Sequence, residues 1–474
     1  MNNLMQKSLT AIWLSLILSA VLLHGQGMFT PWSCDNELYF HRHLQQESTA
    51  MTYSKGAQGL ILLLPAISYS KKAENVSLGV ARLSYMTDHW LFVSSALLDA
   101  PLATEPAYPG KVWRGFAGYV DESFIRYSSR KGLENSNLFF AEAISKKWYE
   151  KLTDPKPHAF LLQMGRSYLR SGRSFDENLL LGWTSQPYPN VTAKWWLGKH
   201  IQFQASAIEL NKETHNGIRY NRFASMHRAV LNLIDNRLSL GFTEAVVYGG
   251  VNRQFELSYI NPVNIWHAEQ LNGGGEANTL VLFDGEYRFS KGRIYYEFLI
   301  DDFQIENKVP GDREPNELGW IIGYNAVNIW KEDYLTLEYS GITNRTYNPP
   351  QPFQRWEYLG TPLAHSLEND FDRWMMEYVL LHGIHQFTLK LEHIRKGEGG
   401  IFVPFDDSFL ADDWPGESFP SGKLSYHSIL SFAHGICIHQ NYAIDYGIDW
   451  HFQEKSSTLF LQLTIPFSKK FEEI

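Results

Sequence analysis

The chain has 474 residues and a formal net charge of -9, which argues against a nucleic-acid partner. Charged residues make up 20% of it, fewer than in typical soluble domains, and aromatic residues make up 15%. After Leu23 no apolar stretch approaches the length of a transmembrane helix. A body that crosses a membrane would therefore have to be a closed β-barrel, because only helices and barrels satisfy every backbone polar group in lipid.

Residues 1–25 are predicted to be a secretory signal peptide. Lys7 is the only charged side chain in this segment, and an apolar run from Ala11 to Leu23 follows it. The run is shorter than the roughly 20 residues that a membrane-spanning helix needs. We expect cleavage and export past an inner membrane, and an uncleaved anchor is the alternative.

Residues 26–74 are predicted to form a helical or irregular segment that precedes the barrel. The chain contains two cysteines, Cys34 and Cys437. One disulfide between them is compatible with an oxidising periplasm, but two cysteines so far apart imply no disulfide framework.

Residues 75–474 are predicted to form an outer-membrane β-barrel, because apolar and polar residues alternate along most of this range. Period two identifies strands, and the apolar face of an exported strand can turn toward lipid. The pattern is clearest near the C-terminus, where one face carries Ile444, Tyr446, Ile448, Trp450 and Phe452 and the other carries Asp445, Gly447, Asp449 and His451. The next strand places Leu461 and Leu463 toward lipid and Gln462 toward the lumen.

The predicted fold is all-β: a transmembrane antiparallel barrel of about 16–18 strands, with short helical segments near its N-terminal part. A barrel of this size leaves a water channel unless something fills it. The helix-like stretch from Asn135 to Leu152 and the segment from Asp35 to Ser54 are candidate fillers, and both could equally be connections. A secreted β-sandwich or propeller is the alternative fold.

Two long loops in the second half are typical of extracellular loops. The first lies at 344–353. The second, at 396–423, contains Asp412, Asp413 and Trp414. Aromatic rings stack on sugar C–H faces and carboxylates accept hydroxyl hydrogen bonds, so this loop is a candidate polysaccharide contact; an ordinary solvated loop is the alternative. The spacing of its aspartates does not match an EF-hand, and we predict no metal or cofactor.

Three arginines, Arg166, Arg170 and Arg173, lie beside a predicted strand end. Their guanidinium groups could bind an acidic polysaccharide, because they match carboxylates bidentately. Alternatively they could pair with lumen carboxylates, for which the candidates are Glu244, Glu269, Glu297, Asp301 and Asp302.

Catalysis is not predicted. Glu297 and Asp301 could approach the spacing of a glycosidase pair, as could many carboxylates in a strand-rich chain. The sequence contains no nucleophile elbow, no metal-spaced histidine cluster and no phosphate loop.

Two central stretches resemble the capsule assembly protein Wzi family. The first runs from Phe160 to Tyr188 and includes a strand that ends in Gly165-Arg166; the second runs from Leu240 to Gln304. The turn at 358–366 is also similar to the glycine-proline turn of that family. This chain departs from the pattern at Arg173, where a second glycine is expected, and in the tail that follows the last strand.

The resemblance implies an outer-membrane barrel of a Gram-negative bacterium that binds, anchors or helps assemble capsular or other surface polysaccharide. A porin-like channel for sugars or small solutes is the alternative. The expected partners are the polysaccharide, outer-membrane lipid and lipopolysaccharide, and the barrel assembly machinery. The predicted contact residues are Arg166, Arg170, Arg173, Glu244, Glu297, Asp301, Asp302, Asp412, Asp413 and Trp414.

Overall fold

The computed structural model describes residues 56–471 with internal gaps, of which the longest are 100–110, 130–158 and 304–313. The predicted signal peptide, both candidate fillers and Cys34 lie outside the described residues, as do the side chains of Cys437, Leu461 and Leu463.

The described residues form one large antiparallel sheet of 21 strands. Three of these are short pieces: β2 (Ala66–Ser70), β5 (Val112–Trp113) and β10 (Glu213–His215). The other 18 build the wall, which confirms the predicted range of about 16–18. In chain order they are β1 (Gly56–Leu63), β3 (Ala73–Met86), β4 (Trp90–Asp99), β6 (Phe116–Ser128), β7 (Ala159–Ser167), β8 (Tyr188–Leu197), β9 (Ile201–Glu209), β11 (Ile218–Leu233), β12 (Leu238–Gly250), β13 (Ala277–Phe289), β14 (Gly292–Asp302), β15 (Glu317–Val327), β16 (Asp333–Ile342), β19 (Phe371–His382), β20 (His385–Lys396), β21 (Ser425–His439), β22 (Tyr442–His451) and β23 (Ser456–Phe471).

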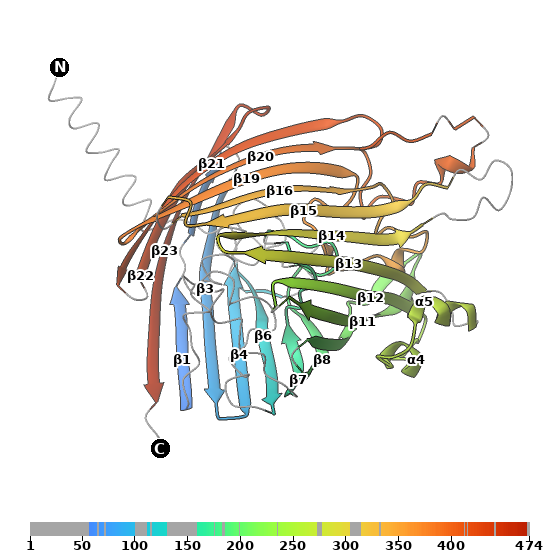
Figure 1. Cartoon of the computed structure of the whole chain (residues 1–474), viewed down its shortest axis with the longest axis horizontal. Coiled ribbons are helices and arrows are strands. Elements are labelled where there is room, and N and C mark those ends of the chain that lie inside the picture. The colour runs from blue at the N-terminus through green and yellow to red at the C-terminus, as the bar shows by residue number, and fades with distance from the viewer. Residues whose placement is uncertain are drawn as a thin grey trace.

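Each wall strand pairs with the next one along the chain, as in an up-and-down barrel (Figure 1). Strand β1 pairs with β3 on one side and with β23 on the other, where Ala57 faces Phe471. The sheet thus begins at Gly56, earlier than the predicted boundary at residue 75. The apolar run at 59–64 has no polar alternation, so a search for period two does not find this strand.

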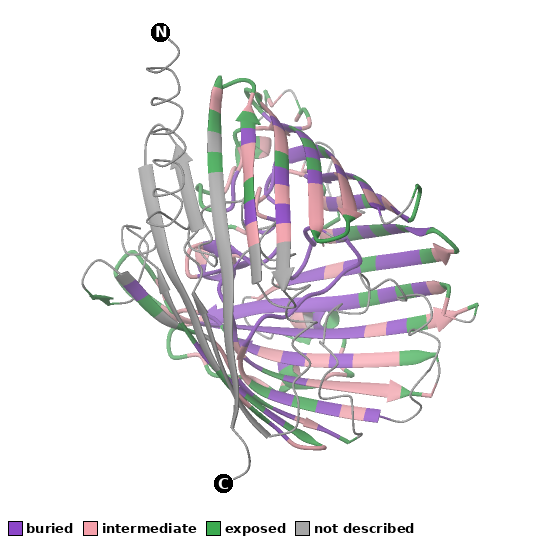
Figure 2. Cartoon of the chain, turned by 90° about the vertical axis from the view of Figure 1, so that its left-hand side faces the viewer, coloured by how far each residue is buried: buried purple, intermediate pink, exposed green. Residues whose placement is uncertain are grey.

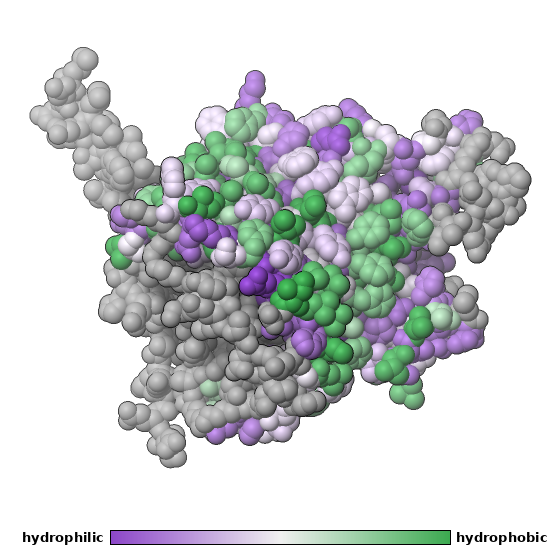
Figure 3. Space-filling model, in the orientation of Figure 1, coloured by the Kyte–Doolittle hydropathy of each residue, from purple (hydrophilic) through white to green (hydrophobic). Residues whose placement is uncertain are grey.

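The alternation along the wall strands separates an outward face from a lumen face (Figure 2). On β14, Ile294 and Tyr296 are 51% and 43% exposed, whereas their neighbours Tyr295 and Glu297 are buried. The predicted alternation of β22 is confirmed for four residues: Tyr446 and Trp450 are exposed, and Asp445 and Asp449 are buried. Figure 3 shows apolar side chains gathered over the outward surface of the wall.

Short turns and long connections lie at opposite ends of the barrel. Turns such as 198–200 and 383–384 join strands at one end. The long connections at 168–187, 251–276, 343–370 and 397–424 follow strands at the other end. They contain the remaining small elements: α4 (Leu257–Ile260), α5 (Trp266–Glu269), η2 (Gln270–Asn272), η3 (Pro352–Gln354), β17 (Glu357–Tyr358), β18 (Thr361–Pro362) and η4 (Ser408–Leu410). Helices α4 and α5 and the connection between β20 and β21 lie on the right of Figure 1.

The main hydrophobic core lies inside the barrel. Leu179, Leu180, Leu181 and Trp356, which belong to two of the long connections, are all fully buried there against lumen-facing wall residues. No helix in the described part of the chain is long and apolar enough to cross a membrane.

The outward face of β15 gives a first test of the lipid-facing wall. Ile322 lies mid-strand and is 55% exposed, and Trp330 lies in the turn after the strand and is 87% exposed. Ile322→Arg should cost about 2–4 kcal/mol, because it places a charge near the bilayer midplane, whereas Trp330→Arg should cost about 0–1 kcal/mol. Urea unfolding in lipid vesicles measures both. Equal costs would show that this face does not meet lipid.

Candidate functional site

The connection between β7 and β8, residues 168–187, folds into the barrel, and we call it the first inner loop. Leu169 and the leucines at 179–181 are fully buried. Its turn starts at Gly172, which has φ = 125°. A Cβ at this position would lie 2.2 Å from the Glu297 carboxylate, so only glycine fits.

Glu297 of β14 holds that turn. Its Oε1 accepts hydrogen bonds from the backbone N–H groups of Arg173 (2.5 Å) and Ser174 (2.6 Å), and from the Asn178 side chain (2.7 Å). Its Oε2 accepts from the N–H of Leu179 at 3.0 Å. One wall carboxylate thus satisfies four donors of a buried turn, which would otherwise lack partners in the lumen.

Arg173 fixes the same turn to β12 and β13. Its guanidinium lies 2.8 Å from Asp284, 3.0 Å from Glu286 and 2.8 Å from Ser239 Oγ. Burial alone would lower the pKa of Arg173, but Glu286 and Asp284 offset it and raise the pKa overall. Arg228 of β11 completes the cluster with a 2.5 Å ion pair to Asp284.

The far side of the first inner loop is bound to β16 and β19. Ser174 Oγ donates to Glu338 of β16 at 2.6 Å, and Asp176 pairs with Arg373 of β19 at 2.5 Å. Arg373 also bonds Glu392 of β20. Together with the contacts to β12, β13 and β14, these bonds hold the loop, which begins at β7 and ends at β8, against the wall strands from β12 to β19.

A second inner loop, residues 343–370 between β16 and β19, covers the first. Tyr347 OH donates to the Leu179 carbonyl and Trp356 Nε1 to the Leu180 carbonyl, while Gly182 N donates to the Leu363 carbonyl at 2.8 Å. Trp356 and Tyr347 are fully buried. The second loop therefore packs directly on the first.

Glu177 and His365 join the two inner loops. Glu177 accepts from the backbone N–H and the hydroxyl of Ser366, and its Oε2 lies 3.3 Å from His365 Nδ1. Burial raises the pKa of Glu177, and burial, assisted by Arg373, lowers the pKa of His365 well below its usual value. His365 is therefore neutral at physiological pH.

The connection between β20 and β21, residues 397–424, forms an outermost layer, which we call the crown loop. Arg345 of the second inner loop holds it with ion pairs to Asp406 (2.7 Å) and Glu417 (2.8 Å). Asp370 accepts from Ser421 N and Gly399 N, both at 2.7 Å. Arg345 is 1% exposed, whereas much of the crown loop faces solvent.

The predicted contact residues do not form one site. Arg170 and Arg173 are buried in the first inner loop, and Arg166 donates to the Pro187 carbonyl and to Tyr358 OH. The three arginines therefore bind other parts of the protein and do not form a surface patch. The alternative prediction, that the arginines pair with lumen carboxylates, is correct for Arg173. Its partners, Asp284 and Glu286, were not among the predicted candidates.

The predicted carboxylates occupy different levels. Glu297 holds the turn of the first inner loop. Asp301 accepts a hydrogen bond at 2.5 Å from the backbone N–H of Tyr347, which belongs to the second inner loop. Asp302 is exposed at the end of β14. Glu244 lies on the same face of β12 as Phe242, which is the outward face, and it is buried beneath α5. The prediction that Glu244 is a lumen contact is therefore wrong. Within the crown loop Asp413 is exposed and Trp414 half-buried, and Asp412 lies outside the described residues.

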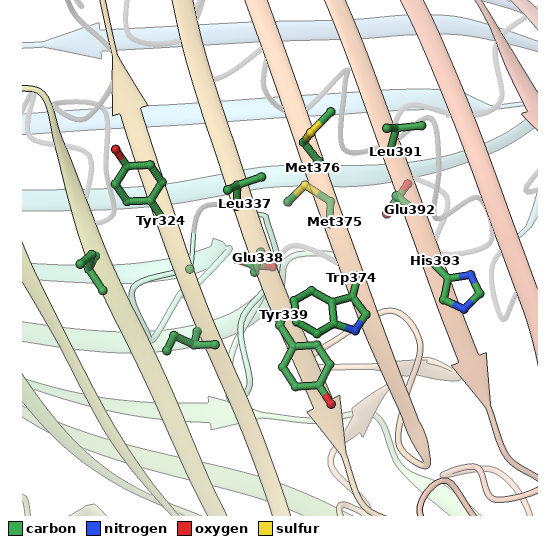
Figure 4. Close-up of a pocket in the computed structure, with 13 residues that line it drawn as sticks. Tyr324, Leu337, Glu338, Tyr339, Trp374, Met375, Met376, Leu391, Glu392 and His393 are labelled. Atoms are coloured by element: carbon green, nitrogen blue, oxygen red, sulfur yellow. The ribbon is translucent and has the colours of Figure 1, made fainter. Parts of the chain in front are cut away.

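One groove of about 790 Å³ lies on the outward face of β14–β16, β19 and β20 (Figure 4). Trp374, Tyr339, Leu391 and Ile322 line it. All four have the outward parity of the lipid-facing wall, so this apolar groove is not part of the lumen or of the crown.

No family model and no curated protein matches the sequence. Among solved structures, Wzi of Escherichia coli, described as an outer-membrane protein involved in group 1 capsule assembly and a carbohydrate-binding β-barrel, aligns with a TM-score of 0.56. The identity is 12%, over 92% of this chain and 89% of that one. The chain has the fold of a Wzi-like outer-membrane barrel.

Two further structures align less closely. OprD of Pseudomonas aeruginosa has a TM-score of 0.45 and 9% identity over 89% of this chain and 97% of that one. OccAB4 of Acinetobacter baumannii has a TM-score of 0.48 and 9% identity over 88% and 99%. The fold is that of an outer-membrane barrel. In barrels of this fold the long loops are extracellular, and the crown loop lies at that end.

Glu297 tests the anchoring of the first inner loop. Glu297→Ala leaves four buried donors without an acceptor, and each lost bond to a charged group is worth about 1.5–3 kcal/mol. We expect the loop of this variant to leave the lumen. The variant should then carry steady ion currents in planar bilayers, whereas the unaltered protein should carry little or no current. Glu297→Gln, which keeps an acceptor oxygen, is the control and should conduct less. Large currents through the unaltered protein would contradict a loop-filled lumen.

Arg345 tests the anchoring of the crown loop. Burial would raise the pKa of Asp406, but hydrogen bonds from Ser408 and the charge of Arg345 lower it overall. A lowered pKa means that the carboxylate stabilises the docked loop above its unfolded pKa of about 3.9, and that this stability is lost as the pH falls below that value.

Protease digestion of intact cells should therefore leave the crown loop uncut at pH 7 and cut it more readily at pH 3, with an acid-stable protease. Arg345→Met should make it cleavable at pH 7, because Asp406 and Glu417 lose their shared partner. Lys423→Met, an exposed change in the same loop, is the control. Equal cleavage of both variants at pH 7 would rule out the Arg345 anchor.

Proposed function

We propose that this protein binds a surface polysaccharide at its extracellular crown and helps to hold it at the cell, by contact rather than by turnover. The observation that carries the proposal is the stack of two inner loops and a crown loop that occupies the lumen and its mouth. Such a stack presents a fixed extracellular surface above a filled barrel. The carbohydrate binding described for the similar Wzi barrel supports this reading.

The chemistry of the crown loop suits sugar hydroxyls. Between 397 and 424 the sequence has six acidic residues, Glu398, Asp406, Asp407, Asp412, Asp413 and Glu417, and one basic residue, Lys423. Phe402 and Leu410 are 41% and 72% exposed, and Trp414 is half-buried. Exposed rings and carboxylates together favour hydroxyl-rich segments of a polymer. The arginines that could attract an anionic chain, Arg170, Arg173 and Arg345, already have carboxylate or carbonyl partners within the protein.

The porin-like alternative requires an open lumen. The first inner loop leaves the wall at β7 and β8 and is bound to β13, β16 and β19, and the second inner loop packs on top of it. A solute would have to displace several buried ion pairs to pass. Binding is therefore the function that the geometry favours.

Polysaccharide retention tests this function. Cells that lack the protein should still make and export polymer but release more of it into the medium, measured as the cell-bound and free fractions after gentle centrifugation. The double substitution Asp413→Asn and Trp414→Ala should reproduce the release, since removing an aromatic anchor costs about 2 kcal/mol or more, roughly 30-fold in affinity.

Trp330→Ala is the matched control, because Trp330 is an exposed aromatic residue at the opposite, short-turn end of the barrel. Heat-modifiability on a gel verifies that each variant folds. A deletion strain with an unchanged cell-bound layer would rule out the anchoring role, whatever the fold. Release by the deletion strain but not by the double variant would place the contact elsewhere on the protein.

A further inference from the structure

One long connection folds outward instead of inward. Residues 251–272, which follow β12 and include α4 and α5, pack on the side of β11 and β12 that faces away from the lumen, and we call them the outer elbow. Trp266 stacks on His227 with 4.2 Å between ring centroids, and Tyr259 stacks on Tyr248 at 4.6 Å. Trp266 and Tyr259 are both buried, so the segment is firmly attached to the wall.

Glu244 fastens the elbow. On the outward face of a barrel an uncovered carboxylate would meet lipid, at a cost that depends on depth. Here Glu244 accepts the backbone N–H of His267 at 2.7 Å and lies 3.0 Å from His227 Nε2, and it is 3% exposed. The elbow therefore covers Glu244 and its cross-strand partner His227, two outward polar side chains that would otherwise meet lipid.

The other surface of the elbow is exposed and rich in large apolar side chains, with the exposed polar residues Asn252, Gln254, Asn261 and His267 among them. The exposed large apolar residues, with their exposed fractions, are Val251 (57%), Phe255 (42%), Leu257 (85%), Ile260 (39%), Val263 (82%) and Ile265 (66%). The two charged side chains between Val251 and Leu257, Arg253 and Glu256, pair with each other at 2.6 Å. Figure 3 shows apolar side chains at the surface where Figure 1 places α4. Exposed apolar surface of this kind marks a contact with another apolar phase or partner.

We infer that the outer elbow inserts these apolar side chains into the outer leaflet of the membrane, where its partner is the acyl-chain layer of the lipid. The elbow follows the extracellular end of β12, directly above outward residues of the same strands, Leu240, Phe242 and Leu231, which are 37–41% exposed. Its apolar tips thus continue the lipid-facing wall.

The form of the surface favours lipid over a second copy of the chain. Leu257 and Val263 protrude almost completely, at 85% and 82% exposure. Isolated protruding apolar side chains fit among mobile acyl chains, as in interfacial anchors. A protein interface would instead bury its apolar residues against a complementary packed surface.

A fluorescent label at two elbow positions tests the inference. In a background with Cys34→Ser and Cys437→Ser, single cysteines replace Leu257 or Val263 and carry an environment-sensitive dye, in nanodiscs that hold one copy of the full mature chain. Ile322→Cys on the lipid-facing wall and Asp407→Cys in the exposed crown loop are the two reference positions. Heat-modifiability selects folded preparations.

We expect the elbow labels to emit at shorter wavelength than the Asp407→Cys label and to be quenched by lipids with brominated acyl chains, as the Ile322→Cys label is. Elbow labels that behave like the Asp407→Cys label would overturn the inference. A blue shift that appears only in nanodiscs with two copies, without quenching by brominated lipid, would assign the surface to a second copy and would also overturn it.

Discussion

The interaction on which the interior depends is the capture of a buried backbone turn by a single wall carboxylate. Glu297 accepts four hydrogen bonds from the first inner loop, and Gly172 leaves the space that its oxygens occupy. Without these bonds, the N–H groups of a turn in the lumen would be buried without acceptors. The free-energy cost of those unpaired groups would oppose the gain from packing Leu179, Leu180 and Leu181. The bound turn then provides the surface on which Trp356 and the second inner loop pack.

The ion pairs of the lumen have the same role at longer range. Arg173 joins the first inner loop to β13, and Arg373 joins it to β19 and β20. Removing one member of a buried pair leaves an uncompensated charge, so these pairs hold the loop in one position whatever their net contribution to stability. Outward from them the order is second inner loop, then crown loop, with Arg345 as the link. The extracellular surface is thus supported layer by layer from the wall.

Periodicity predicted the wall well and the interior poorly. Alternation is a local property, so the outward positions of Tyr446 and Trp450 and the approximate strand number could be predicted. The inner loops have no period, and their bonds join residues far apart in the chain: Arg173 and Glu297 are separated by 124 positions. No local pattern predicts that pairing. Glu244 is different, because its parity with Leu240 and Phe242 already indicated an outward position, and counting along the strand would have excluded it from the lumen.

Direct binding tests the central claim, which is that a filled barrel holds polysaccharide at its extracellular crown. The measurement is biolayer interferometry of the full mature chain in nanodiscs against the surface polymer isolated from cells that carry the protein. We predict saturable binding that free polymer competes away and that nanodiscs without protein do not show. Absence of binding by folded, heat-modifiable protein would contradict the claim.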